Sequence, residues 1–101
     1  MMHISELQIT PVKPSDGLVG FASFVLNNEL YLGSIGIHTR LDGSGYRLTF
    51  PTKKVGEQNL HIFHPINKEA ASYLETLISQ HFEEVMQSNH DRHYRSYSPA
   101  L

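Results

Sequence analysis

The residues best placed to do chemistry in this chain are a lysine pair, Lys53 and Lys54, which directly follows Phe-Pro-Thr. Pro51 has no N–H to donate to a ladder, so it predicts the end of a strand. We expect both lysines just past that strand end, on a mobile loop held by a fixed scaffold. Ammonium groups placed there could bind phosphates. A lysine pair in a loop is, however, usually solvated surface, because lysine is rarely buried.

The charge distribution allows a local anionic partner on an acidic molecule. The chain has a formal net charge of −2, which argues against a nucleic-acid binder of the simple basic kind. Residues 40–57 nevertheless carry four basic and two acidic side chains, whereas residues 67–86 carry four acidic and one basic. Arg47 is the candidate that accompanies the lysine pair. We expect the basic residues of 40–57 to form a patch for an anionic partner, and the acidic residues of 67–86 to be solvated surface.

The C-terminal stretch, residues 89–101, interleaves Arg92 and Arg95 with Tyr94 and Tyr97. Arginine and tyrosine together can contact phosphates and stack on bases, as in proteins that bind single strands. The same stretch could be a frayed terminus. We therefore divide the chain into a domain of residues 1–88 and a helix extension or flexible tail of residues 89–101.

The histidines do not predict a metal site. His61 and His64 lie three residues apart on a predicted strand, so we expect them on opposite faces, with His64 bonding backbone in the following turn. His90 and His93 could share a helix face, but no third ligand has matching spacing. Nothing places a nucleophile beside a base and an orienting group. We expect no enzyme activity, no cofactor, no metal and no small-molecule substrate.

Composition predicts one globular domain. The chain has 101 residues, is 40% hydrophobic and contains no cysteine, which excludes disulfides and thiolate chemistry. No apolar run approaches the roughly 20 residues of a membrane span. The first residues show no basic region followed by an apolar one. We expect a soluble cytoplasmic protein with no membrane partner.

Five apolar segments separated by turn residues predict an antiparallel meander. The first is an edge strand, because Pro11 and Pro14 interrupt its pattern. Asn27-Asn28 suits a two-residue hairpin turn, and Gly33 and Gly36 suggest a bulge or bend. Such short connections exclude parallel pairing. The predicted strands are residues 4–12, Leu18–Leu26, Leu30–Thr39, Tyr46–Phe50 and Leu60–Phe63, with a polar loop at Val55–Asn59.

A long amphipathic helix follows the strands. Asn67 is a good N-cap, and Glu69 places a negative charge in the first turn. Apolar residues then recur at spacings of three and four, at Ala70, Leu74, Leu77, Ile78, Phe82 and Val85. A sheet covered by one helix is an α+β fold. The other sheet face then needs a cover, which a homodimer would supply.

The motifs Phe-Pro-Thr-Lys-Lys (50–54) and His-Pro-Ile-Asn (64–67), followed by the helix, resemble the SpoVG septation protein family. The corresponding family pieces usually read Met-Pro-Ser-Lys-Arg and His-Pro-Ile-Asn, and the resemblance covers roughly residues 3–86. It implies a SpoVG-like fold in a small bacterial cytosolic dimer that binds DNA and RNA and affects septation, sporulation or gene expression. The family's basic pair corresponds to Lys53 and Lys54. Its variable C-terminal extension, thought to tune target choice, corresponds to the residues from Asn89.

Two departures from the family pattern weaken the case for nucleic acid. Lys54 replaces an arginine, so a point charge replaces a bidentate fork, and Gly36 stands where the family often has arginine. The sequence thus leaves two functions open. One is a DNA- or RNA-binding regulator; the other is a protein-interaction adaptor of cell division without nucleic-acid binding. The predicted contacts for the first are Lys53, Lys54, Arg47, Arg92 and Arg95.

Overall fold

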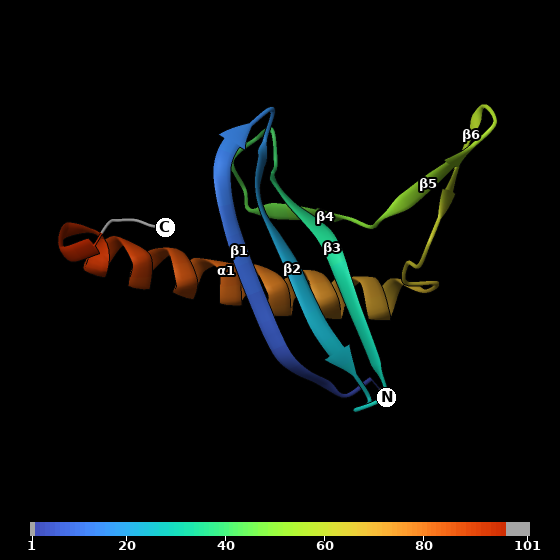
Figure 1. The fold of residues 1–101 in the computed structure, drawn as a ribbon, viewed down its shortest axis with the longest axis horizontal. Coiled ribbons are helices and arrows are strands. Elements are labelled where there is room, and N and C mark those ends of the chain that lie inside the picture. The colour runs from blue at the N-terminus through green and yellow to red at the C-terminus, as the bar shows by residue number, and fades with distance from the viewer. Residues whose placement is uncertain (1, 97–101) are drawn as a thin grey trace.

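The computed structural model describes residues 2–96, with side chains described up to residue 88. Six strands precede one helix (Figure 1). They are β1 (Ile4–Ser15), β2 (Leu18–Leu26), β3 (Leu30–Thr39), β4 (Tyr46–Thr49), β5 (Thr52–Val55), β6 (Gln58–His61) and α1 (Lys68–Ser96). No helix within residues 2–96 combines the length and apolar character that crossing a membrane requires.

The first four strands form an antiparallel meander in the order β1-β2-β3-β4, as predicted. β1 is an edge strand, and Pro11 and Pro14 lie within it. An edge position tolerates both prolines because one side of the strand donates no ladder hydrogen bonds.

The predicted turn and bulge are both present. Asn27 and Asn28 have φ values of 54° and 58°, a conformation that asparagine tolerates better than most residues. Between β2 and β3 the register shifts where Gly33 and Ser34 face a single β2 residue, and Ser34 has a φ of 61°. Gly36 is not part of this bulge, since it pairs regularly with Phe21 and Thr49.

Helix α1 packs on one face of the sheet and completes the core (Figure 1). Asn67 is its N-cap, because the Ala70 N–H donates a 2.7 Å hydrogen bond to the Asn67 side chain. The buried residues come from β2, β3 and α1: Ala22, Phe24, Ile35, Ile37, Leu74, Ile78 and Phe82. The α+β arrangement predicted from the sequence is therefore confirmed.

The segment around the lysine pair differs from the prediction. Lys53 and Lys54 lie inside β5 rather than on a loop, and β6 begins two residues before the predicted Leu60. Val55 pairs with Gln58 across a two-residue turn in which Gly56 has a φ of 64°. Gly56 thus lets the chain reverse at once, so strand replaces the predicted polar loop.

Candidate nucleic-acid interface

The two lysines lie on a two-stranded hairpin, residues 52–61, which we call the arm. β5 and β6 pair only with each other among the described strands, and all eight of their residues are exposed. At the base of the arm the Ile62 N–H donates a 2.9 Å hydrogen bond to the Pro51 carbonyl. Figure 1 shows the arm projecting away from the sheet and α1. The arm therefore presents both of its faces to the surroundings.

Lys53 and Lys54 point to opposite faces of the arm. Successive side chains alternate along a strand, so adjacent residues cannot share a face. Lys53 pairs across the hairpin with Leu60, and Lys54 pairs with Asn59. The two ammonium groups therefore belong to two separate surfaces.

These two surfaces differ in chemistry. Alternation and pairing place Lys53, Val55, Gln58 and Leu60 on the Lys53 face, and Thr52, Lys54, Asn59 and His61 on the Lys54 face. On the Lys53 face, Val55 is 51% exposed and Leu60 is 48% exposed. The Lys54 face carries only polar side chains, and its single cation stands among groups that can donate hydrogen bonds. The Lys54 face is the more suitable of the two for phosphate oxygens.

A histidine pair extends the Lys54 face. The ring centroids of His61 and His64 are 4.4 Å apart, so the expectation that they point apart was wrong. The reason is that β6 ends at His61 and the chain bends before His64. The predicted backbone bond of His64 is confirmed, since its Nδ1 donates to the Pro65 carbonyl oxygen at 2.9 Å. Within the described residues, no three His, Cys, Asp or Glu side chains form a metal-binding group.

Arg47 lies in β4, not on the arm, and pairs with His38 of β3. Its side chain is exposed and makes no hydrogen bond or ion pair within residues 2–88. Burial of His38, and then the charge of Arg47, hold the pKa of that imidazole below its ordinary value of 6.5. The imidazole is therefore neutral at neutral pH, and its Nε2 lies 3.0 Å from the Thr49 hydroxyl.

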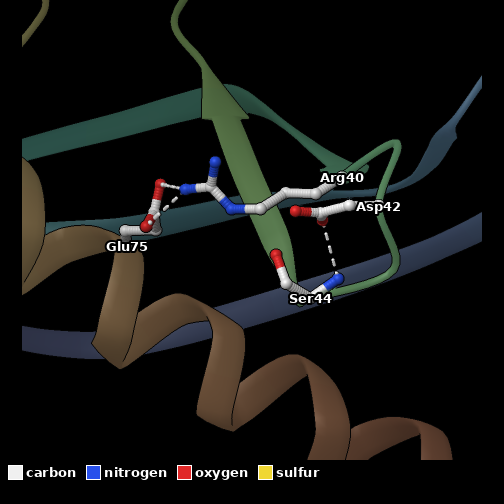
Figure 2. A network of polar contacts seen from close by, with 4 residues as sticks. All are labelled: Arg40, Asp42, Ser44 and Glu75. Carbon is white, nitrogen blue, oxygen red and sulfur yellow. Dashed lines mark hydrogen bonds and ion pairs between the residues drawn. The ribbon is translucent and has the colours of Figure 1, made fainter.

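A second arginine of the basic stretch, Arg40, is neutralised by the helix. Its Nη2 donates to both carboxylate oxygens of Glu75 at 2.9 Å, as Figure 2 shows. In the adjoining turn, the Ser44 N–H donates to Asp42 (Figure 2). Arg40 and Glu75 are 35 residues apart in sequence, so no local pattern could have revealed their pairing.

The sequence predicted the acidic side chains of the helix as solvated surface, but a second one of them, Glu83, also contacts the rest of the body. The Tyr46 hydroxyl donates a hydrogen bond to the Glu83 carboxylate. That bond, followed by burial and the charge of Glu83, raises the pKa of Tyr46 to about 12. Glu75 and Glu83 thus attach α1 to Arg40, which follows β3, and to Tyr46 at the start of β4. Lys53, Lys54 and Arg47 remain as the described basic candidates.

Arg92 and Arg95 fall in the last turns of α1, where side chains are outside the described residues. Their contribution stays a prediction, as does the division of the chain at residue 88. Tyr97 lies beyond the described residues altogether.

A comparison with known protein families matches the SpoVG family over residues 2–84. The chain belongs to the SpoVG family. No curated protein matches it closely enough to be counted as a relative. SpoVG membership indicates a regulatory role related to septation or sporulation. The SpoVG match includes the arm and Arg47 and ends before Arg92.

Proposed function

We propose that this SpoVG protein is a regulator that binds DNA or RNA, with the arm as its principal contact with phosphates. The observation that carries the proposal is the placement of Lys53 and Lys54 on an exposed hairpin that projects from the body (Figure 1). Neither lysine makes an ion pair within residues 2–88. The protein acts by binding, without catalysis or a cofactor.

The division of the arm into two faces makes the proposed roles of the lysines unequal. Lys54 stands on the polar face beside Asn59 and His61 and makes the principal phosphate contact. Lys53 stands among apolar residues and contributes mainly through long-range attraction. Each neutralised phosphate adds roughly −0.7 to −0.9 to the slope of log affinity against log salt concentration. One arm therefore supplies a modest site, to which Arg47, Arg92 and Arg95 add.

We propose in addition that the protein acts as a homodimer. The arm and the segment that follows it expose apolar side chains that a monomer leaves in water: Val55 at 51%, Leu60 at 48%, Ile62 at 63% and Ile66 at 87% exposed. An arm that projects from one copy can place its Lys53 face against a second copy. Light scattering of the wild type and of a Val55→Ser/Leu60→Ser variant tests this, because the variant should be a monomer.

The same apolar residues favour a second candidate function. If the Lys53 face binds a different protein, the molecule is an adaptor of cell division with no direct role on nucleic acid. The adaptor needs the apolar side chains of the arm and does not need Lys54. Loss of nucleic-acid binding in a lysine variant therefore separates the two functions.

The deciding experiment measures binding of short single- and double-stranded DNA and RNA at low and moderate salt. The variants are Lys53→Ala, Lys54→Ala and the double variant, each checked for folding by circular dichroism. Lys13→Ala is the matched control, because Lys13 is also an exposed strand lysine but lies in β1. We expect salt-sensitive binding that weakens more in Lys54→Ala than in Lys53→Ala and is unchanged in Lys13→Ala. No binding at low salt would falsify the nucleic-acid proposal and leave the adaptor.

A further inference from the structure

The sheet face opposite α1, which we call the open face, has no cover within residues 2–88. Ala22, Phe24, Ile35 and Ile37 point to the core, so the residues that alternate with them point away from it. Pairing then assigns the open face: Ser5, Gln8, Thr10, Ser15, Leu18, Phe21, Ser23, Val25, Tyr31, Gly36, His38, Arg47 and Thr49. None of these residues is acidic, and Arg47 is the one that is always charged.

Two aromatic rings stand out on this mostly polar face. Tyr31 is 71% exposed and Phe21 is 39% exposed. The Tyr31 ring lies against Gly33, because a Cβ built on Gly33 would be 3.1–3.4 Å from three of its atoms. Phe21 pairs with another glycine, Gly36, on the β3 side and with Thr10 on the β1 side, so no bulky side chain stands directly opposite it. Both rings are thus supported by the sheet and offer a surface to an incoming flat group.

The surface on either side of Phe21 is hollowed. One hollow, of about 340 Å³, is lined by Gln8, Thr10, Ser23, Tyr31 and Ser34 besides Phe21. The other, of about 650 Å³, has an apolar part formed by Leu18, Leu48, Phe50 and Pro51 and a polar part that includes Ser34, His38 and Thr49. Amide, hydroxyl and imidazole groups can donate and accept hydrogen bonds, as the edges of bases require.

The larger hollow runs into the arm. Its lining includes Thr52 and His61, the pair at the base of the hairpin. Both residues belong to the Lys54 face, so the polar face of the arm and the open face form one continuous surface. A chain that crosses this surface meets a cation on the arm, then hydrogen-bonding groups, then two aromatic rings.

We propose that the open face binds the bases of single-stranded nucleic acid, with Phe21 and Tyr31 as stacking partners and Lys54 holding the backbone. This proposal rests on the proposed function and names the form of nucleic acid that is bound. Stacking on exposed aromatic side chains of a sheet needs unpaired bases, because the bases of a duplex already stack on one another. Binding therefore favours single strands over duplexes of the same sequence.

The composition of the open face favours this occupant over a second copy of the chain. Interfaces between protein subunits are rich in apolar side chains at their centre, whereas hydroxyl, amide, imidazole and guanidinium groups make up most of this face. Its one permanent charge, on Arg47, is positive and complements a phosphate backbone. The larger exposed aliphatic side chains lie outside this face, on the arm, in the segment after it, at the start of β3 (Leu30) and in the turn after β3 (Leu41).

The test uses the full chain and a thymidine oligonucleotide of about 12 nucleotides, within the range of single-strand site sizes, with some thymines replaced by 5-iodouracil. Irradiation links an iodinated base to an aromatic ring stacked on it, and mass spectrometry locates the link. Affinities are measured for Tyr31→Ala, Tyr31→Phe, Phe21→Leu and Lys54→Ala. Tyr73→Ala is the control, because Tyr73 is also an exposed tyrosine, at 46%, but lies on α1.

We expect links at Phe21 or Tyr31 and an affinity loss of about 5- to 150-fold in Tyr31→Ala, the range measured for losing one stacked base. Tyr31→Phe and Tyr73→Ala should bind like the wild type. Phe21→Leu keeps an apolar side chain but should lose affinity with the aromatic ring.

Other outcomes overturn the proposal in distinguishable ways. If Lys54→Ala weakens binding while Tyr31→Ala and Phe21→Leu do not, and no link maps to the open face, the stacking surface is wrong but the proposed function stands. If Tyr31→Ala instead converts a dimer to a monomer without changing affinity, the face is covered by a second copy. If no oligonucleotide binds at low salt, the proposed function fails and the stacking surface fails with it.

Discussion

The body of the protein and its arm are built from the same kind of strand, yet they keep their shape in different ways. The body buries seven hydrophobic side chains between the sheet and α1, including Ile35, Ile37 and Ile78 at 0% exposure. The arm buries none, and a two-stranded hairpin without a second layer is marginally stable in water. The difference shows that the arm contributes little to folding stability and that its residues are free to serve binding.

The largest expected change in the free energy of unfolding comes from a substitution in the core of the body, and it contrasts with a substitution on the arm. Ile78→Ala should lower the free energy of unfolding by about 2–5 kcal/mol, because it leaves a cavity in the core. Leu60→Ala on the arm should change the stability of the monomer by about 0.5 kcal/mol or less. Urea unfolding followed by circular dichroism, at protein concentrations that keep the chain monomeric, measures both. An equally large loss in Leu60→Ala would mean that the arm is covered within a single copy and belongs to the same packed unit.

A smaller loss of stability is expected from a substitution at Gly36, where the open face is tightly packed. A Cβ on Gly36 would lie 2.5 Å from the Thr49 hydroxyl oxygen and 3.1 Å from His38 Nε2. Gly36→Ala should therefore destabilise the body by about 1–3 kcal/mol, the usual range for overpacking. The same crowding explains why a residue without a side chain stands at position 36. Combining Gly36→Ala with Thr49→Ala should restore part of the loss in urea unfolding, whereas no recovery would show that Thr49 is not the obstacle.

Two asparagines, Asn67 in the body and Asn59 on the arm, allow the same substitution to be compared in both regions. Asn67→Ala removes the N-cap of α1 and should cost about 1 kcal/mol of stability. Asn59→Ala on the arm removes a side chain with no hydrogen bond within the described residues and should change stability by about 0.5 kcal/mol or less. Thermal and urea unfolding of the two variants measure both stability changes. Equal losses would show that the cap bond contributes nothing beyond an ordinary surface change.

The smallest predicted effect is a pH dependence confined to the body. The pKa of His38 is lowered in the folded state by burial and then by Arg47. As the pH falls below about 6.5, the unfolded chain binds a proton at His38 before the folded one does, so stability decreases. The wild type should therefore lose more stability than His38→Asn between pH 7.5 and 5.5 in urea unfolding.

A matched control for this pH dependence is His3→Gln, which replaces an exposed histidine at the start of the chain. That variant should keep the pH dependence of the wild type. If His38→Asn and the wild type lose stability in parallel, the pH dependence does not arise at His38.

Local patterns in the sequence were enough to predict the elements of the body and one feature of the site. Leu18–Leu26 alternates clearly, Asn27-Asn28 tolerates positive φ, and Asn67 caps a helix, because each signal depends only on neighbouring residues. The lysine pair and its position after Pro51 were also evident, and the SpoVG match confirms the family that these motifs suggested.

What the tertiary structure alone decided is how residues distant in the chain share a surface. The two faces of the arm arise because β5 pairs with β6, and the Arg40–Glu75 bond joins segments 35 residues apart. The contact of His61 with His64 depends on a bend that alternation does not predict. The open face exists because α1 is a single layer and can cover only one side of the sheet. Local sequence sets where strands and helices form, but long-range pairing and packing determine which side chains meet.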